Sequence, residues 1–94
     1  MSADQPREIP IAFPEALKGG VYSNNMVVSH TREEFLLDFL MVAPQGGAVV
    51  ARVVVSPGHA KRIAAALQEN LRKYEEHFGP IATAEGPKGP IGFS

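Results

Sequence analysis

The group of titratable side chains with the clearest potential for chemistry consists of His30, Glu34 and Asp38, spaced four residues apart. A histidine beside carboxylates could transfer protons as a general acid and base. The same residues also fit a solvated turn, with Asp38 paired to Arg52 from a neighbouring strand. We favour the second interpretation, because no nucleophile lies nearby in a recognisable motif. We therefore expect no catalytic residue and no enzyme.

Asp38 and Arg52 are isolated charges within otherwise apolar segments. Such charges are rarely buried unless they are paired. We expect the turn between their two strands to centre on Gln45 and Gly46. Asp38 then lies opposite Val53 and diagonal to Arg52, and a shift of one residue makes the two charges direct partners. Two interpretations stay open: the pair fixes the strand register or an oligomer interface, or both side chains point to water at the sheet edge.

The composition predicts neither a metal nor a cofactor. The chain has no cysteine, and no two of its three histidines, His30, His59 and His77, are closer than 18 positions. The lack of cysteine fits a reducing compartment, and we expect a cytoplasmic protein. No apolar run approaches the ~20 residues of a membrane span, so we expect no membrane association.

Two groups of residues are candidates for binding. Tyr22, Asn24 and Asn25 could form a ligand-facing strand of the kind that binds single-stranded nucleic acid, although the chain has only two tyrosines and no tryptophan. Basic residues of the predicted helix could contact phosphates, but acidic residues are interspersed among them and the net charge is −1. The basic residues are Lys61, Arg62, Arg72 and Lys73. We favour a solvated helix face and expect nucleic acid to be a poor partner.

A long C-terminal helix is the clearest element of the predicted fold. Ser56 is a good N-cap and Pro57 suits the first helical position, whereas Gly79 and Pro80 end the helix. Apolar residues at spacings of three and four form a stripe along it. This helix stripe consists of Ala60, Ile63, Ala64, Leu67, Leu71, Tyr74 and Phe78.

Strands are predicted upstream of this helix. Residues 48–55 are rich in valine, which favours a strand, and residues 21–30 alternate in part between apolar and polar side chains. Residues 9–13 could form a short edge strand, because the prolines at 10 and 14 exclude a central one.

Residues 33–43 fit either a strand or a helix that begins with a capping box of Thr31 and Glu34. Periodicity alone does not separate the two. We favour the strand, because residues 44–47 then form a turn into the next strand and the flanking strands gain hairpin partners.

These elements predict a single α+β domain in residues 9–80. It consists of an antiparallel sheet of three to four strands, followed by one long C-terminal amphipathic helix. Residues 1–8 and 81–94 are expected to be flexible tails, the second because it is rich in glycine and proline.

The strands in residues 33–43 and 48–55 are apolar on both faces, whereas one helix covers only one face. Soluble monomers rarely expose a large apolar patch. We therefore expect a homodimer or a larger assembly that completes or covers the sheet. The alternative is that the N-terminal segment folds over the open face. The residues expected in the oligomer interface are Leu36, Leu40, Val42, Val49 and Val53.

Two blocks of the sequence resemble a family catalogued as domain of unknown function 3467. The resemblance extends roughly over residues 20–80. The first block includes Tyr22, Asn24, Val27, Ser29, Glu34, Phe35, Leu37, Asp38 and Phe39, and the second includes Ser56, His59, Ala60, Leu67, Glu69, Asn70, Tyr74, Glu75, Phe78 and Gly79. The resemblance implies the fold and a cytoplasmic setting, and it implies no catalytic residue.

A weaker resemblance is to the SecB export chaperone, which has a similar Glu-Phe-x-Leu-Asp-Phe pattern in a strand, four strands followed by helix, and a tetrameric assembly. This chain has one predicted helix where SecB has two, and it lacks the acidity of SecB. The resemblance implies chaperone-like binding, although a shared fold does not by itself establish a function.

The sequence thus supports a non-enzymatic, self-associating binding or assembly module, whose partner is a second copy or another protein. The alternative is a nucleic-acid-associated regulator that uses the basic positions of the helix.

Overall fold

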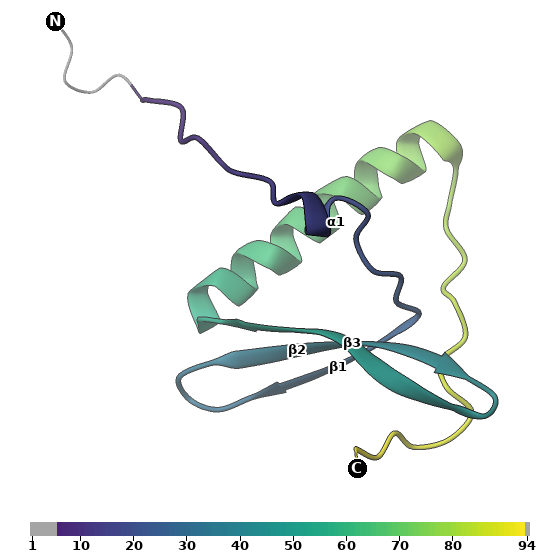
Figure 1. The fold of residues 1–94 in the computed structure, drawn as a ribbon. Coiled ribbons are helices and arrows are strands. Elements are labelled where there is room, and N and C mark those ends of the chain that lie inside the picture. Colours follow the sequence, from purple (N-terminus) through teal and green to yellow (C-terminus); the bar gives the residue numbers. More distant parts are fainter. Residues whose placement is uncertain (1–5, 94) are drawn as a thin grey trace, which may run out of the picture.

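The computed structural model describes residues 6–93, in which three strands form one antiparallel sheet and a single α-helix follows them. The strand order is β1-β2-β3 (Figure 1). The elements are η1, a 3₁₀ helix (Glu15–Leu17), β1 (Asn25–His30), β2 (Phe35–Ala43), β3 (Gly46–Val55) and α1 (Pro57–Phe78). The predicted α+β fold with one C-terminal helix is confirmed. Part of the predicted N-terminal tail, residues 1–5, lies outside the described residues, as does residue 94.

The ambiguous segment is a strand, β2, which pairs with β1 on one side and β3 on the other. The residues of the predicted capping box, Thr31 and Glu34, nevertheless form hydrogen bonds with each other. The Thr31 hydroxyl accepts hydrogen bonds from the backbone N–H groups of Glu33 and Glu34, and the Thr31 N–H donates to the Glu34 carbonyl. Such bonds satisfy a turn as well as a helix N-terminus. Here they hold the loop of the β1–β2 hairpin, and pairing on both sides fixes the extended backbone.

The β2–β3 turn lies one position earlier than the sequence indicated. Ala43 pairs with Gly46, so Pro44 and Gln45 form a two-residue loop. Gly46 adopts a φ of 136°, a conformation that residues with a Cβ rarely adopt. Gly47 is required for a different reason: a Cβ there would lie 2.8 Å from the Met41 carbonyl oxygen. Two successive glycines therefore allow this tight hairpin.

The two faces of the sheet are named here after their central β2 residues. The Asp38 face carries Leu36, Asp38 and Leu40, and the Phe39 face carries Leu37 and Phe39, because successive side chains of a strand alternate between faces. Within residues 6–93, Leu40 is the only apolar residue that is fully buried, at 4% exposed, and Asp38 is the only polar one, at 2%. The core of the single chain is therefore minimal.

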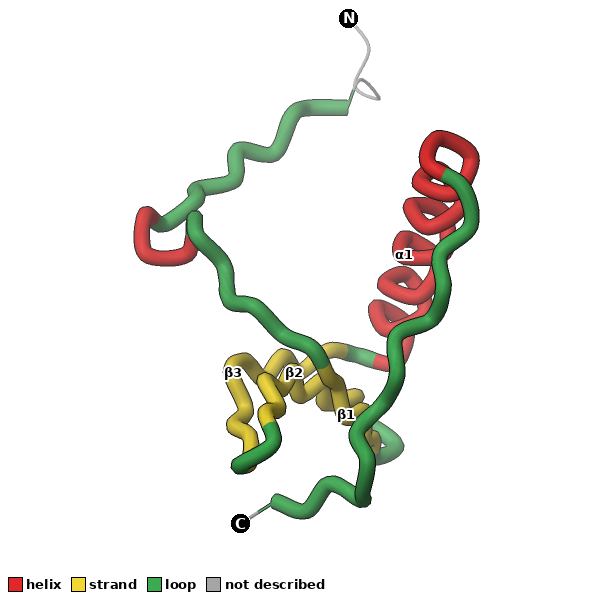
Figure 2. The backbone as a smooth tube through the Cα atoms, turned by 90° about the vertical axis from the view of Figure 1, so that its right-hand side faces the viewer, coloured by secondary structure: helices red, strands yellow, loops and turns green. Residues whose placement is uncertain are grey.

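The N-terminal segment forms neither the suggested edge strand nor a cover for the sheet. Residues 9–13 have no regular structure, because prolines within and after them remove ladder donors. Ile9 and Ile11 are 79% and 80% exposed, and Phe13 is 65% exposed. Figure 2 shows this segment running away from the sheet, on the side opposite α1. The alternative in which it folds over the open face is wrong for this chain.

Helix α1 begins and ends as predicted. The Ser56 hydroxyl accepts from the His59 N–H at 3.1 Å, and the Gly79 N–H donates to the Glu75 carbonyl with a φ of 88° at Gly79. The helix leaves the end of β3 and rises away from the sheet at an angle (Figure 1). Its apolar stripe is consequently exposed towards its C-terminal end, where Phe78 is 71% exposed.

Residues 79–93 contain no helix or strand, and they return to the sheet. It passes β1 and ends beneath the sheet in Figure 2. Residues 90–93 line a groove on the Asp38 face together with Leu40, Val42 and Val49. The C-terminal segment therefore lies across a groove from Leu40, which the expectation of a flexible tail did not include.

Candidate functional site

Asp38 and Arg52 form a two-pronged ion pair at the centre of the sheet. They are direct cross-strand partners, because the turn before β3 lies one position earlier than expected and an extra residue, Val50, bulges out of β3 between the turn and Arg52. Arg52 Nε lies 2.5 Å from Asp38 Oδ1, and Arg52 Nη2 lies 2.9 Å from Asp38 Oδ2. The Asp38 side chain is 3% exposed and that of Arg52 is 56% exposed. The predicted diagonal arrangement is thereby corrected to a direct one, and the carboxylate does not point to water.

The geometry makes Asp38 a poor proton carrier. Hydrogen bonding from Arg52 is the largest influence on its pKa, which lies below the usual value of 3.8 despite the opposing effect of burial. The same bonds raise the pKa of Arg52. Both carboxylate oxygens are occupied, and the group is ionised at neutral pH. The pair can hold a register or neutralise a charge, but it offers no free acid or base.

The structure does not bring His30, Glu34 and Asp38 together. His30 pairs with Phe35, whose side chain lies on the Phe39 face, so His30 and Asp38 point to opposite sides of the sheet. The His30 ring stacks on the Phe35 ring, with 5.1 Å between centroids. Glu34 lies in the hairpin loop. This separation removes the geometric basis of the acid–base hypothesis.

Asn24 extends the sheet by one position through its side chain. Its Oδ1 accepts from the Val42 N–H and its Nδ2 donates to the Val42 carbonyl, each at 2.9 Å. The Ser23 hydroxyl donates to the carbonyls of Asn25 and Leu40, at 2.8 and 2.9 Å. Tyr22 is 79% exposed. Of the three residues suggested to face a ligand, Asn24 is thus committed to the backbone of β2, whereas the role of Tyr22 and Asn25 stays a prediction.

The five residues expected in an oligomer interface do not share one face. Leu36, Leu40 and Val42 lie on the Asp38 face, and Val49 pairs with Leu40. Val53 pairs with Leu37 and therefore lies on the Phe39 face. A β-bulge at Val50 causes this division, because the extra residue shifts the alternation of β3. No sequence signal marked the bulge within a run of similar residues.

An open trough of about 720 Å³ lies between the Phe39 face and α1. Its apolar lining includes Met26, Leu37 and Phe39 from the sheet, and Ile63 and Leu67 from the helix. From Leu67 to the end of α1, the helix stripe is exposed. Leu67, Leu71, Tyr74 and Phe78 are 60%, 50%, 49% and 71% exposed. We call these lining residues and the exposed stripe the apolar trough.

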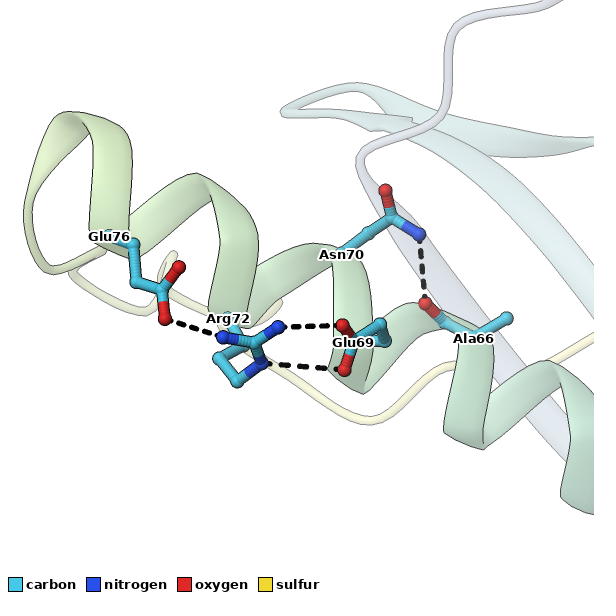
Figure 3. Close-up of polar contacts among 5 residues, drawn as sticks. All are labelled: Ala66, Glu69, Asn70, Arg72 and Glu76. Carbon is cyan, nitrogen blue, oxygen red and sulfur yellow. Dashed lines mark hydrogen bonds and ion pairs between the residues drawn. The ribbon is translucent and has the colours of Figure 1, made fainter.

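The polar side of α1 is occupied by its own ion pairs, as Figure 3 shows. Arg72 contacts the Glu69 carboxylate through Nη2 at 2.7 Å and through Nε at 3.3 Å, and its Nη1 bonds Glu76 (Figure 3). The Asn70 amide donates to the Ala66 carbonyl, one turn earlier. Two carboxylates thus neutralise one of the arginines on which the nucleic-acid alternative depends.

Residues 6–93 contain no cluster of three or more potential metal-ligating His, Cys, Asp or Glu side chains. The His59 N–H donates to the helix cap, and His77 packs edge-on against Phe78 with 5.4 Å between ring centroids. In the same range, no helix combines the length and apolar character needed to cross a bilayer.

Comparison with known proteins places the chain in a family. The sequence model of a family described as "Protein of unknown function (DUF3467)" matches residues 1–83. No curated protein and no solved structure matches the chain. The match includes the sheet, the Asp38–Arg52 pair, the apolar trough and all of α1, and it ends before the segment that lines the groove beside Leu40. The protein therefore belongs to the DUF3467 family.

Proposed function

We propose that the protein is a non-enzymatic assembly module whose fold is completed by a second copy of the chain in the apolar trough. The observation that carries this proposal is the near absence of a core in one chain. Within the described residues Leu40 alone among the apolar residues is fully buried. A domain of this size is marginal even with a well-formed core. A protomer with so little buried apolar surface needs a partner in order to fold.

The exposed surface area of the chain also supports the need for a partner. The chain exposes 8672 Å², whereas a compact monomer of 10.1 kDa exposes about 5,300 Å². Its radius of gyration is 17.5 Å, against about 12 Å for a compact chain of 94 residues. The excess area is about 3,400 Å² per chain, and obligate homodimers bury roughly 2,000–5,000 Å² over both partners. Part of this excess belongs to the extended N-terminal segment, where Ile9 and Ile11 are 79% and 80% exposed, and the remainder is available for an obligate interface.

The shape of the trough also favours a second copy. Figure 2 shows the N-terminal segment and α1 diverging above the sheet, so that the protomer is open between them. Four large apolar side chains of the helix stripe are each at least 49% exposed. Unpartnered apolar surface of this extent is rare in soluble monomers. An identical stripe from a second copy has the matching apolar character and length.

A chaperone-like role, in which the trough binds apolar segments of other proteins, is the related hypothesis. We favour a second copy, because the protomer must gain a core before it can bind a client. The nucleic-acid alternative has weaker support, since Arg72 is held by Glu69 and Glu76 and the net charge is −1.

The Leu71→Glu variant tests the proposal. Leu71 lies in the helix stripe and is half exposed in the single chain, so a charge there buries nothing within one protomer but disrupts an apolar interface. Ala65→Glu is the matched control: it introduces the same charge on the polar side of α1. We expect Leu71→Glu to lower the mass measured by sedimentation equilibrium, and Ala65→Glu to leave it unchanged. Equal masses for Leu71→Glu and the parent chain would contradict the proposal.

A further inference from the structure

Beyond its β-bulge, the outer edge of β3 is apolar and carries neither a proline nor a free charge. β3 has ten residues and lies at one side of the sheet. Edge strands expose unpaired N–H and C=O groups, and natural proteins protect them with free charges, prolines or covering segments. β3 contains no proline, and its only charged residue is Arg52. The Arg52 guanidinium is bonded to Asp38, so no free charge guards this edge.

The half of β3 after the β-bulge is regular and exposed, and within the described part of the chain no segment lines a groove beside it. Val53 and Val54 point to opposite faces and are 44% and 50% exposed. The first half lies beside residues 90–93 of the C-terminal segment. The opposite edge of the sheet, β1, is shorter and has polar neighbours: Asn24 and Asn25 line a groove together with residues 85–91. Of the two edges, the second half of β3 is therefore the better site for another strand.

We infer that the second half of β3 pairs in antiparallel fashion with β3 of a second copy, which joins two three-stranded sheets into one continuous sheet. This inference rests on the proposed self-association and adds a second contact surface, the edge of β3, to the contact in the apolar trough. A two-fold axis brings the same residues of both copies close together. The two arginines at position 52 then approach each other, and Asp38 neutralises each of them from within its own sheet. This gives a reason for an acidic residue in the middle of an apolar strand.

Single cysteines test the pairing, because the chain has no cysteine of its own. Around a two-fold axis in an antiparallel pair, same-residue Cα separation is about 5 Å at the axis, and the offset along the strand grows by about 7 Å per residue. A disulfide needs Cα atoms within roughly 7 Å. We therefore place one cysteine in turn at each of residues 51–55 and oxidise each variant mildly. Val28→Cys, on β1 and with a similar exposure of 46%, is the matched control.

We expect covalent dimer to form in high yield at one position of residues 51–55, to fall at its neighbours, and to stay at background in Val28→Cys. Non-reducing gels give the yield, and sedimentation equilibrium of the reduced variants gives the mass. Background yield at all five positions in variants that still self-associate would overturn the β3 pairing and leave the proposed function standing. Background yield in variants of monomer mass would overturn both.

Discussion

Dilution is the perturbation that most simply separates a chain that folds alone from one that folds with a partner. When folding and association are coupled, the midpoint of thermal unfolding, Tm, falls on dilution by mass action. The entropy of unfolding is about 2.1 cal/mol/K per residue near 60 °C. For two chains of 94 residues it is therefore about 0.4 kcal/mol/K. A tenfold dilution lowers the free energy that stabilises the folded dimer by about 1.4 kcal/mol. The expected decrease in Tm is therefore about 4 °C per tenfold dilution.

The assay is thermal unfolding followed by far-ultraviolet circular dichroism over a hundredfold concentration range. The account predicts a total decrease in Tm of about 8 °C for a dimer, and a larger one for a tetramer. A tail that is unstructured in the native state contributes no unfolding entropy, which increases the shift. A Tm that stays constant within about 1 °C over the whole range would refute the reasoning, because it would mean that a single chain is stable despite its minimal core.

Three further predictions concern individual side chains. Leu40→Ala removes the one fully buried apolar side chain of the described residues and is expected to lower the free energy of unfolding by about 2–5 kcal/mol; a negligible change in the urea midpoint would contradict it. Asn24→Ala removes two hydrogen bonds to Val42 and is expected to cost about 1–2 kcal/mol, measured in the same way, while an unchanged midpoint would show that water replaces the amide without loss. The bonds from Arg52 lower the pKa of Asp38 in the folded state relative to 3.8, so their stabilisation is complete above the unfolded pKa and is lost as the pH falls through the folded one. As the pH falls below the unfolded pKa of Asp38, the free energy of unfolding of Asp38→Asn should therefore decrease less than that of the parent chain. Equal decreases would contradict the claim that the bonds from Arg52 stabilise the ionised Asp38.

The helix could be predicted from local signals, and the ambiguous strand only from its neighbours. Ser56, Pro57 and Gly79 mark the ends of α1 through hydrogen bonds that involve their immediate neighbours. The choice of a strand for residues 33–43 depended on an argument about neighbours, since Thr31 satisfies a hairpin loop as readily as a helix N-terminus. Pairing with a strand on each side decides between the two conformations, and a hydrophobic pattern shows that only indirectly.

The register could not be predicted, because it depends on one residue in the turn and one in the bulge. The turn at Pro44 and Gln45 would by itself place Asp38 opposite Ala51, and the bulge at Val50 makes Arg52 its direct partner and places Val53 on the other face. A change of one residue reverses the face of every side chain that follows. The path of the C-terminal segment beside the groove at Leu40 could not be predicted either, since its glycines and prolines carry no periodic pattern.

The mass of the protein in solution tests the central claim most directly. Static light scattering or sedimentation equilibrium across a dilution series gives that mass without labels or variants. For a chain of 10.1 kDa, the account predicts at least twice this mass at high concentration, with dissociation accompanied by loss of secondary structure. A folded species of 10.1 kDa that persists at all concentrations would contradict the account.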